Sequence, residues 1–199
     1  MVKLNRIYTR TGDDGHTQLT RNGRLIKSAP RIEAIGSVDE LNCGLGVLIA
    51  DLNQYSNNMG QSTDFLSRIQ NDLFNLGAEI AMQVTEPDPR SPCIQTSDVS
   101  KLEQDIDHMN TTLPELNSFI LPQGDPCIAQ AHMARSICRR CERRLVALNE
   151  SEPLRATTLH YVNRLSDWLF VLARHIGQKQ NIPEVTWKPN QGETHAPEA

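Results

Sequence analysis

The chain has 199 residues, of which 38% are apolar and 22% charged, and its formal net charge at pH 7 is -4. This composition is typical of a globular protein with one sizeable core, and we expect a single domain. The small negative charge excludes a protein that binds nucleic acid through its overall field, so any basic cluster has to act as a local site.

The cysteines and the apolar runs bear on location. Five cysteines are a sparse and odd set, which fits a reducing compartment better than a disulfide framework. The first residues contain no apolar signal-peptide core, and no later run approaches about 20 continuous apolar residues. We therefore expect a cytoplasmic protein with no membrane partner.

Residues 1–30 form a polar, glycine-punctuated arm in which short extended pieces are possible around Ile7-Tyr8 and Thr17-Gln18-Leu19. Within it, Gly12 and Gly15 lie three apart among threonines and one arginine, so backbone N–H groups can converge there on an anion. The alternative is a simple turn, for which Asp14-Gly15 is a type I′ signal, and spacing alone favours the turn. The pattern of a Walker A loop is missing.

Beyond the arm, apolar residues recur every three or four positions, which predicts amphipathic helices. Four are long, at about 32–52, 65–80, 128–148 and 154–176, and a shorter one covers about 99–109. Ser97 or Asp98 can cap the short helix, and Asp125 can cap the helix that follows Pro126. We predict an all-α bundle over residues 31–180, with a disordered tail at 188–199.

The helix expected at 128–148 carries five arginines and one glutamate between residues 135 and 144. Arg135, Arg139 and Glu142 fall at i, i+4 and i+7, so they share one stripe beside an apolar stripe that includes Cys138 and Cys141. Guanidinium groups fork onto phosphate or carboxylate, so this helix can be half core and half anion receptor.

Four polar residues on two other helices are ambiguous when taken alone. Asp39 and Glu40 interrupt the first apolar stripe and can orient an arginine, although a solvated face is the simpler interpretation for Glu40. Asn163 and Asp167 lie at i, i+4 on the last helix, and a surface position is as plausible for them as a site.

A metal site is a weak alternative. The Cys138-x-x-Cys141 pair lies on the apolar stripe without a second pair, which indicates core residues rather than zinc ligands. No Glu-x-x-His pair occurs on two helices, so a di-iron bundle is disfavoured. We interpret His132 and His175 as hydrogen-bonded helix residues.

Together these motifs resemble one family, the PduO-type ATP:cob(I)alamin adenosyltransferases, also called corrinoid adenosyltransferases. The resemblance covers about residues 5–187 in family order. It rests on six segments, namely Thr9 to Thr17, Lys27 with Arg31 to Gly36, Ser37 to Asn42, Phe119 to Pro122, Arg135 to Arg143, and Asn163 to Phe170.

The resemblance implies a single domain over residues 1–187, a five-helix bundle with a ferritin-like up-down arrangement, and a homotrimer. It also implies that ATP and the corrinoid bind between subunits. The reaction would transfer the 5′-deoxyadenosyl group of ATP to the cobalt of cob(I)alamin, which gives adenosylcobalamin and triphosphate. A reductase and adenosylcobalamin-dependent enzymes are the protein partners that this function allows.

The resemblance also assigns roles to individual residues. It implies that Mg²⁺ is held through the phosphates of ATP rather than by a dedicated protein ligand. The residues that it implies contact ATP are Thr9, Arg10, Thr11, Gly12, Asp13, Gly15, Thr17, Lys27, Arg139, Arg140, Glu142, Arg143 and Asn163. Asp39 would pair with Arg135 across the interface, and Asp167 would be a second acid of the site. Phe119 would crowd the lower face of the corrin and expel its axial ligand, beside Trp168.

Two features depart from the family pattern on the corrin side. Gln123-Gly124-Asp125 follows Pro122 where many members have a glycine-rich Pro-Gly-Gly or Pro-Ser-Gly-Gly sequence, and Trp168 stands where phenylalanine is common. Two other functions stay open, a corrinoid carrier or nucleotide sensor without turnover, and a nucleic-acid binder that uses the arginines. The acidic balance and the missing aromatic platform argue against nucleic acid.

Overall fold

The computed structural model describes residues 7–19, 23–55, 59–86 and 92–189. These residues form five α-helices, which confirms the predicted helices, and one small antiparallel sheet that the sequence did not predict. The elements are β1 (His16–Gln18), β2 (Arg24–Ile26), α1 (Pro30–Tyr55), α2 (Gly60–Met82), α3 (Thr96–Asn110), α4 (Pro126–Ser151) and α5 (Ala156–Lys179).

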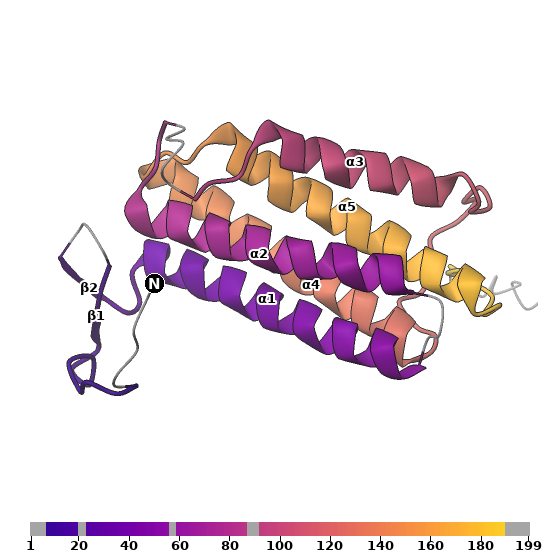
Figure 1. Cartoon of the computed structure of the whole chain (residues 1–199), viewed down its shortest axis with the longest axis horizontal. Helices are drawn as coiled ribbons and strands as arrows, with labels where there is room; N and C mark the ends of the chain where they lie inside the picture. The colour runs from indigo at the N-terminus through magenta and orange to yellow at the C-terminus, as the bar shows by residue number, and fades with distance from the viewer. Residues whose placement is uncertain (1–6, 20–22, 56–58, 87–91, 190–199) are drawn as a thin grey trace, which may run out of the picture.

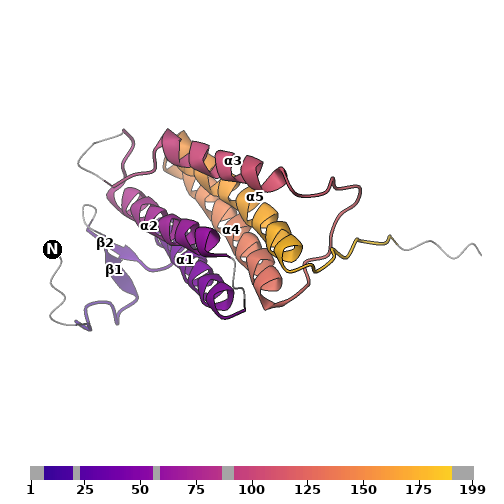
Figure 2. The ribbon, with the colours of Figure 1, turned by 45° about the vertical axis from the view of Figure 1, so that its right-hand side comes forward.

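The helices lie side by side along one long axis (Figure 1). α1 packs against α2 and α4, α4 packs against α5, and α5 packs against α3. The contacts Glu33–Arg144 and Glu40–Arg140 make α1 and α4 antiparallel, whereas Glu103–Arg164 and Thr112–Gln178 make α3 and α5 parallel. Figure 2 shows α3 along the top of the bundle next to α5, and α2 next to α1 on the side of the N-terminal arm.

The core consists of the predicted apolar stripes. Leu41, Leu45 and Leu48 of α1 are fully buried, and so is the apolar stripe of α4 from Ala131 to Leu148. Removing each such leucine from water stabilises the fold by about 1.5–3 kcal/mol. The arginine helix is therefore half core, as predicted.

The beginnings of two helices test the predicted caps. Asp125 accepts a hydrogen bond from the N–H of Ile128 at 2.9 Å and Pro126 occupies the first turn, so the predicted start of α4 is confirmed. α3 begins at Thr96, earlier than predicted, and neither Ser97 nor Asp98 is its N-cap. Gln95 is its N-cap, and Asp98 accepts from the N–H of Gln95 at 2.9 Å as the second half of a capping box.

α5 ends in a Schellman turn that reverses the chain. Asn181 adopts φ 57°, the N–H of Ile182 donates to the carbonyl of Gly177 at 2.8 Å, and that of Asn181 donates to Gln178 at 3.1 Å. Residues 182–187, here called the C-terminal strap, then run beside residues 111–125, here called the Phe119 loop. A bridge between Ile120 and Thr186 joins them.

The Phe119 loop returns to α4 through a glycine that its geometry requires. Gly124 has φ 146°, and a Cβ there would lie 2.8 Å from the side chain of Ile128. Only glycine allows this approach without a shift of the neighbouring helix. Residues 123–125, which depart from the family pattern, therefore include one position, Gly124, that the local packing restricts to glycine.

The N-terminal arm stands off the end of the bundle where α1 begins (Figure 1). β1 and β2 pair with His16 opposite Ile26 and Gln18 opposite Arg24. Of the two predicted extended pieces, the one at Ile7-Tyr8 is not a strand, whereas the one at Thr17-Gln18-Leu19 overlaps β1.

Within the described residues no helix is long and apolar enough to cross a membrane. The predicted disordered tail lies almost wholly outside the described residues.

Candidate active site

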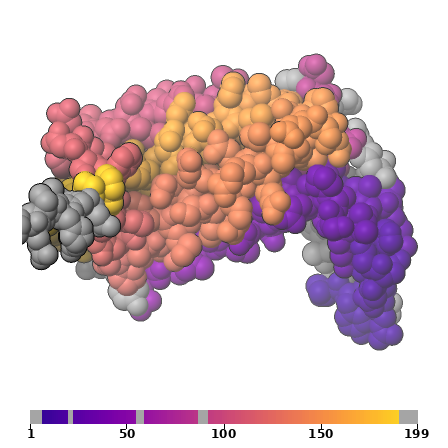
Figure 3. All heavy atoms as spheres, turned by 180° about the vertical axis from the view of Figure 1, so that it is seen from behind, coloured from indigo at the N-terminus to yellow at the C-terminus, as the bar shows by residue number. Residues whose placement is uncertain are grey.

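α4 lies beside α1 on the face of the bundle that Figure 3 shows. Four arginines of α4 are exposed, namely Arg139, Arg140, Arg143 and Arg144. α1 neutralises part of their charge, because Glu40 pairs with Arg140 at 2.5 Å and Glu33 pairs with Arg144 at 3.3 Å. Among the described residues, no carboxylate lies within ion-pair distance of Arg139 or Arg143. Positive charge on this face is therefore available to an anion.

Two predicted nucleotide residues meet at the α4–α5 contact. Asn163 donates from Nδ2 to Oε1 of Glu142 at 2.7 Å. One turn further along α5, Asp167 accepts from Arg164 at 2.6 Å, and Arg164 also reaches Glu103 at 3.1 Å. Asp167 is thus ion-paired within its own chain rather than free.

Arg135 lies in a cavity of about 690 Å³ between α4, α5, the Phe119 loop and the strap. Phe119, Phe170 and Trp187 line the same cavity. The Nε of Arg135 is buried and has no hydrogen-bond partner among the residues that the structure describes. Burial, and then the charge of Arg139, lowers the pKa of Arg135. A guanidinium held in this way favours a carboxylate or phosphate partner.

His132 lines the same cavity one turn before Arg135. It is only 4% exposed, and its Nδ1 has no partner among the described residues. Burial, and then the charge of Arg135, lowers the pKa of His132 to about 4, so the ring is neutral at pH 7. The Nδ1 of His175 is likewise without a partner among the described residues, so the hydrogen bonding predicted for these two histidines is not found at that ring nitrogen.

Asp39 does not meet Arg135 within the chain. It lies on the exposed side of α1 in a groove with Asn42, Gln70 and Phe74, whereas Arg135 faces the cavity beside α5. Asp39 makes no ion pair with any described residue. The predicted pair therefore requires a second subunit.

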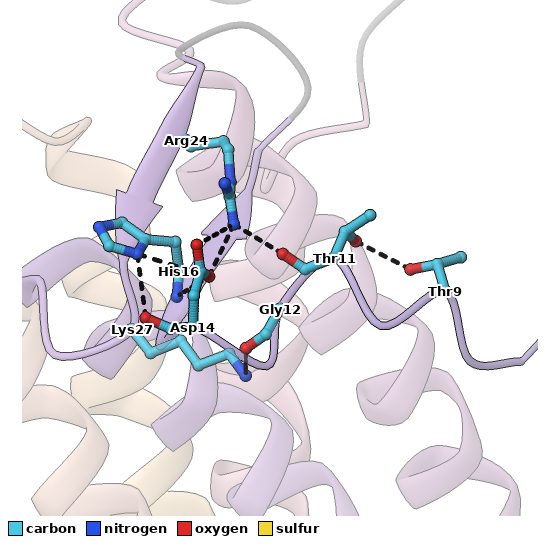
Figure 4. Close-up of polar contacts among 7 residues, drawn as sticks. All are labelled: Thr9, Thr11, Gly12, Asp14, His16, Arg24 and Lys27. Atoms are coloured by element: carbon cyan, nitrogen blue, oxygen red, sulfur yellow. Dashed lines mark hydrogen bonds and ion pairs between the residues drawn. The ribbon is translucent and has the colours of Figure 1, made fainter.

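The arm loop is an ordered turn (Figure 4). Lys27 donates to the carbonyl of Gly12 at 2.8 Å, and Arg24 donates to the carbonyl of Thr11 at 2.6 Å and to Asp14 at 2.7 Å. The N–H of His16, and then Arg24, lower the pKa of Asp14. The arm therefore holds two cations around one short loop.

The backbone of this turn departs from the type I′ prediction. A type I′ turn needs positive φ at both central residues, and here Arg10 and Gly15 adopt it, with φ 61° and 82°, while Asp14 does not. The hydroxyls of Thr9 and Thr11 lie 2.8 Å apart, Asp13 is exposed on the turn, and Thr17 lies in β1. In the described residues, no hydrogen bond or ion pair joins the arm to α4 of the same chain.

Trp168 requires a correction. Its ring is fully buried, stacks on Phe65 at 5.2 Å and donates from Nε1 to Asp105 at 2.7 Å. The side chain faces α2 and α3, since one residue step along a helix turns a side chain by about 100°. The aromatic ring of α5 that lines the Phe119 cavity is Phe170 instead.

Cys138 and Cys141 are fully buried free thiols, as the core interpretation predicted. Burial raises the pKa of Cys141 to about 11, which disfavours the thiolate that metal binding needs. In the part of the chain that the structure describes, no three His, Cys, Asp or Glu side chains are grouped so that they could hold a metal ion.

Sequence reasoning missed four residues of these regions. His132 lies three positions before Arg135 on the same helix face, which was a usable signal. Phe170 ends the segment Asn163 to Phe170 that resembles the family, but Trp168 of the same segment was predicted to lie at the corrin. Arg24 and Trp187 gave no signal, because their roles depend on contacts with segments distant in sequence.

The fold and these regions define a class of protein. It is a helical bundle with guanidinium groups on one face and an aromatic-lined cavity next to them, which suits a polyanion and a large, partly apolar ligand. Residues 7–176 match the family model described as cobalamin adenosyltransferase. The chain belongs to the cobalamin adenosyltransferase family and is a transferase.

Two curated relatives agree with this assignment. The chain is 39% identical to the corrinoid adenosyltransferase of Bacillus subtilis, over 92% of each chain. It is 40% identical to the cobalamin adenosyltransferase of Cupriavidus metallidurans, over 94% of this chain and 96% of that one.

A solved structure is also similar. It is a variant of the PduO-type ATP:corrinoid adenosyltransferase from Lactobacillus reuteri, complexed with cobalamin and ATP. Its TM-score is 0.83 at 32% sequence identity, and the match covers 92% of this chain and 100% of that one. The fold described above is therefore one that binds both of those molecules in another protein.

Proposed function

We propose that this protein transfers the 5′-deoxyadenosyl group of ATP to the cobalt of cob(I)alamin, which yields adenosylcobalamin and inorganic triphosphate. Co(I) attacks the 5′ carbon, the carbon–oxygen bond to the triphosphate breaks, and negative charge grows on the leaving group. Cations held near that group stabilise the transition state more than the ground state. The chain needs no side-chain nucleophile, because the corrinoid supplies it.

The nucleotide would lie between the arm and the arginine side of α4. Thr9 to Thr17 with Lys27 would wrap the triphosphate, while Arg139, Arg140 and Arg143 would add charge. Glu142 and Asn163 would contact the nucleotide next to them. This assignment is supported by the arm geometry, where Lys27 and Arg24 converge on one turn. It is also supported by Arg139, which is exposed and has no carboxylate partner in the described part of the chain.

The arm of one subunit would complete the site of the next in a homotrimer. Three observations support this assembly. The arm makes no polar contact with α4 of its own chain in the described residues, Asp39 and Arg135 lie apart in one chain, and apolar side chains remain exposed on helices around α1 and α4. These side chains are Val47, Phe74, Met133 and Val146, between 46% and 71% exposed.

Mg²⁺ would bind through the phosphates of ATP. The described residues offer no cluster of three ligands of their own, and Mg²⁺ prefers phosphate oxygens and water to an all-protein cage. Bound there, it would neutralise charge on the triphosphate. The carboxylate of Asp14 is already held by Arg24 in this structure.

The corrinoid would enter the cavity with Phe119 and Arg135. Phe119 is 80% exposed, so a large apolar face can cover it. Its ring would occupy the position of the axial ligand below the corrin. Loss of that ligand makes Co(II) easier to reduce, which lets a weak biological reductant produce Co(I).

The single observation that carries this proposal is the cavity that joins Arg135, with its unpartnered Nε, to the exposed ring of Phe119. The test is anaerobic incubation of the protein with ATP, Mg²⁺ and chemically reduced cobalamin. We expect light-sensitive adenosylcobalamin and one released triphosphate for each adenosyl group transferred. Tight binding of both substrates without product would instead identify a carrier or sensor.

Five free cysteines, three of them fully buried, suit a reducing compartment, and we place the protein in the cytoplasm. There an electron-donating reductase would supply Co(I). Enzymes that depend on adenosylcobalamin would consume the product.

A further inference from the structure

The Phe119 loop has little apolar packing of its own. Phe119 is 80% exposed, and every other residue from 114 to 119 is exposed as well. Its backbone is held by the C-terminal strap instead. The N–H of Leu121 donates to Val185 at 2.8 Å, and the N–H of Trp187 donates to the carbonyl of Phe119 at 2.7 Å. The position of the Phe119 ring thus depends on where the strap lies.

One buried guanidinium ties both segments to α5. Arg174 donates from Nε to Oε1 of Glu184 in the strap at 2.6 Å, and from Nη2 to the carbonyl of Pro114 in the loop at 2.7 Å. Its side chain is 5% exposed, and that of Glu184 is 27% exposed. Charge-assisted bonds from a planar fork are among the most directional contacts in proteins. Arg174 therefore fixes the strap and the loop relative to each other.

We propose that Arg174 and Glu184 are positioning residues that hold the Phe119 ring in the corrin cavity. This inference rests on the proposed function. The Trp187 ring supports the same arrangement, because it meets the Phe119 ring edge-on with centroids 6.2 Å apart. Without the Arg174–Glu184 pair, the loop would sample other conformations and the ring would occupy its position for less of the time.

The two halves of the proposed reaction depend differently on this ring. Cob(I)alamin carries no lower axial ligand, so adenosyl transfer from chemically reduced cobalamin does not require Phe119 to displace one. Cob(II)alamin does carry the ligand. A misplaced Phe119 would therefore impair ligand loss from enzyme-bound cob(II)alamin and spare transfer from cob(I)alamin, a split that a general loss of stability would not produce.

The chain offers a matched control at the other end of α5. Arg155 donates from Nη1 to Oε2 of Glu79 at 3.1 Å and to the carbonyl of Ile94 at 2.9 Å, and its side chain is 8% exposed. Like Arg174, it joins one carboxylate and one backbone carbonyl. It lies outside the Phe119 cavity, whose lining does not include it.

The experiment compares Arg174→Gln, Glu184→Gln and Arg155→Gln with the wild-type chain. The absorption and electron paramagnetic resonance spectra of cob(II)alamin, with saturating ATP, give the fraction that lacks the lower ligand. We expect Arg174→Gln and Glu184→Gln to reduce the ratio of ligand-free to ligated cob(II)alamin about tenfold. Transfer from chemically reduced cob(I)alamin should stay at the wild-type rate. Arg155→Gln should lower the melting temperature and leave both readouts unchanged.

The double variant Arg174→Gln/Glu184→Gln should lose no more than Arg174→Gln alone, because the two residues act as one pair. Wild-type spectra for the Arg174 and Glu184 variants, or an equal loss in Arg155→Gln, would overturn the positioning role and leave the proposed function intact. No transfer by the wild-type chain would overturn both. If Arg174→Gln does not fold, Glu184→Gln decides, since its carboxylate is partly exposed.

Discussion

Asn163 of α5 donates a hydrogen bond to Glu142 of α4 at 2.7 Å. This contact joins the two helices that contribute Arg139 and Asp167, so the spacing between the proposed nucleotide groups is set by packing of the bundle core. Cys138 lies beneath it and contacts the carbonyl of Val162 at 3.3 Å. The α4–α5 part of the proposed site is thus built on two packed helices, whereas the arm and the Phe119 loop contribute their groups from non-helical segments.

Removing one guanidinium tests the arginine face. We expect Arg139→Ala to reduce kcat/KM for adenosyl transfer about a hundredfold, because Arg139 has no carboxylate partner in the described chain and would stabilise the leaving triphosphate. Helical content should be unchanged, since the side chain is exposed. Arg144→Ala is the control, because Arg144 already pairs with Glu33. Equal losses in the two variants would contradict a specific role for Arg139.

Mixing two inactive variants tests whether the site spans subunits. Asp39→Asn removes the acid and Arg135→Ala removes its proposed partner, and we expect each variant alone to be inactive. In trimers reassembled from equal amounts of both, about a quarter of the interfaces would combine an intact Arg135 with an intact Asp39. Activity should therefore return in the mixture. A mixture as inactive as its components would exclude the cross-subunit pair.

The helices could be predicted because their signals are local. The apolar stripe of α4 has the right period, and Asp125 with Pro126 marks its start within a few residues. The sheet could not be predicted in the same way. β2 is three residues long, and its pairing with β1 is accompanied by a bond from Arg24 back to Asp14, which precedes β1. Such a contact leaves no periodic pattern in the sequence.

In the candidate site, too, the parts with a local sequence signal could be predicted and the parts that depend on tertiary contacts could not. The stripe that holds Arg135 and Arg139 follows from helical geometry, so the sequence predicts it. The aromatic side chain that α5 contributes to the cavity was assigned wrongly, because Trp168 and Phe170 are two steps apart and face different sides of the helix. The strap was missed since only folding brings Trp187 to Phe119.

A half-buried acid in the groove between α2 and α3 predicts a stabilising substitution. Asp72 accepts from the hydroxyl of Tyr161 at 3.0 Å, and burial raises the pKa of Asp72. Its ionised form therefore destabilises the fold at pH 7. Asp72→Asn keeps the acceptor without the charge, so we expect its melting temperature to rise by a few degrees. The gain should vanish below pH 3.8, the ordinary pKa of the acid. A gain as large in exposed Asp107→Asn would contradict this cause.

His132 predicts how stability depends on pH. Its pKa is about 4 in the folded chain, against 6.5 ordinarily, so the unfolded chain binds the proton first. The stability that neutral His132 confers is complete above pH 6.5 and declines as pH falls towards 4. We expect denaturant unfolding to show that His132→Gln removes this part of the pH dependence. His160 is exposed, so the free energy of unfolding of His160→Gln should depend on pH as that of the wild type does. The same pH dependence in His132→Gln would contradict a neutral, buried ring at His132.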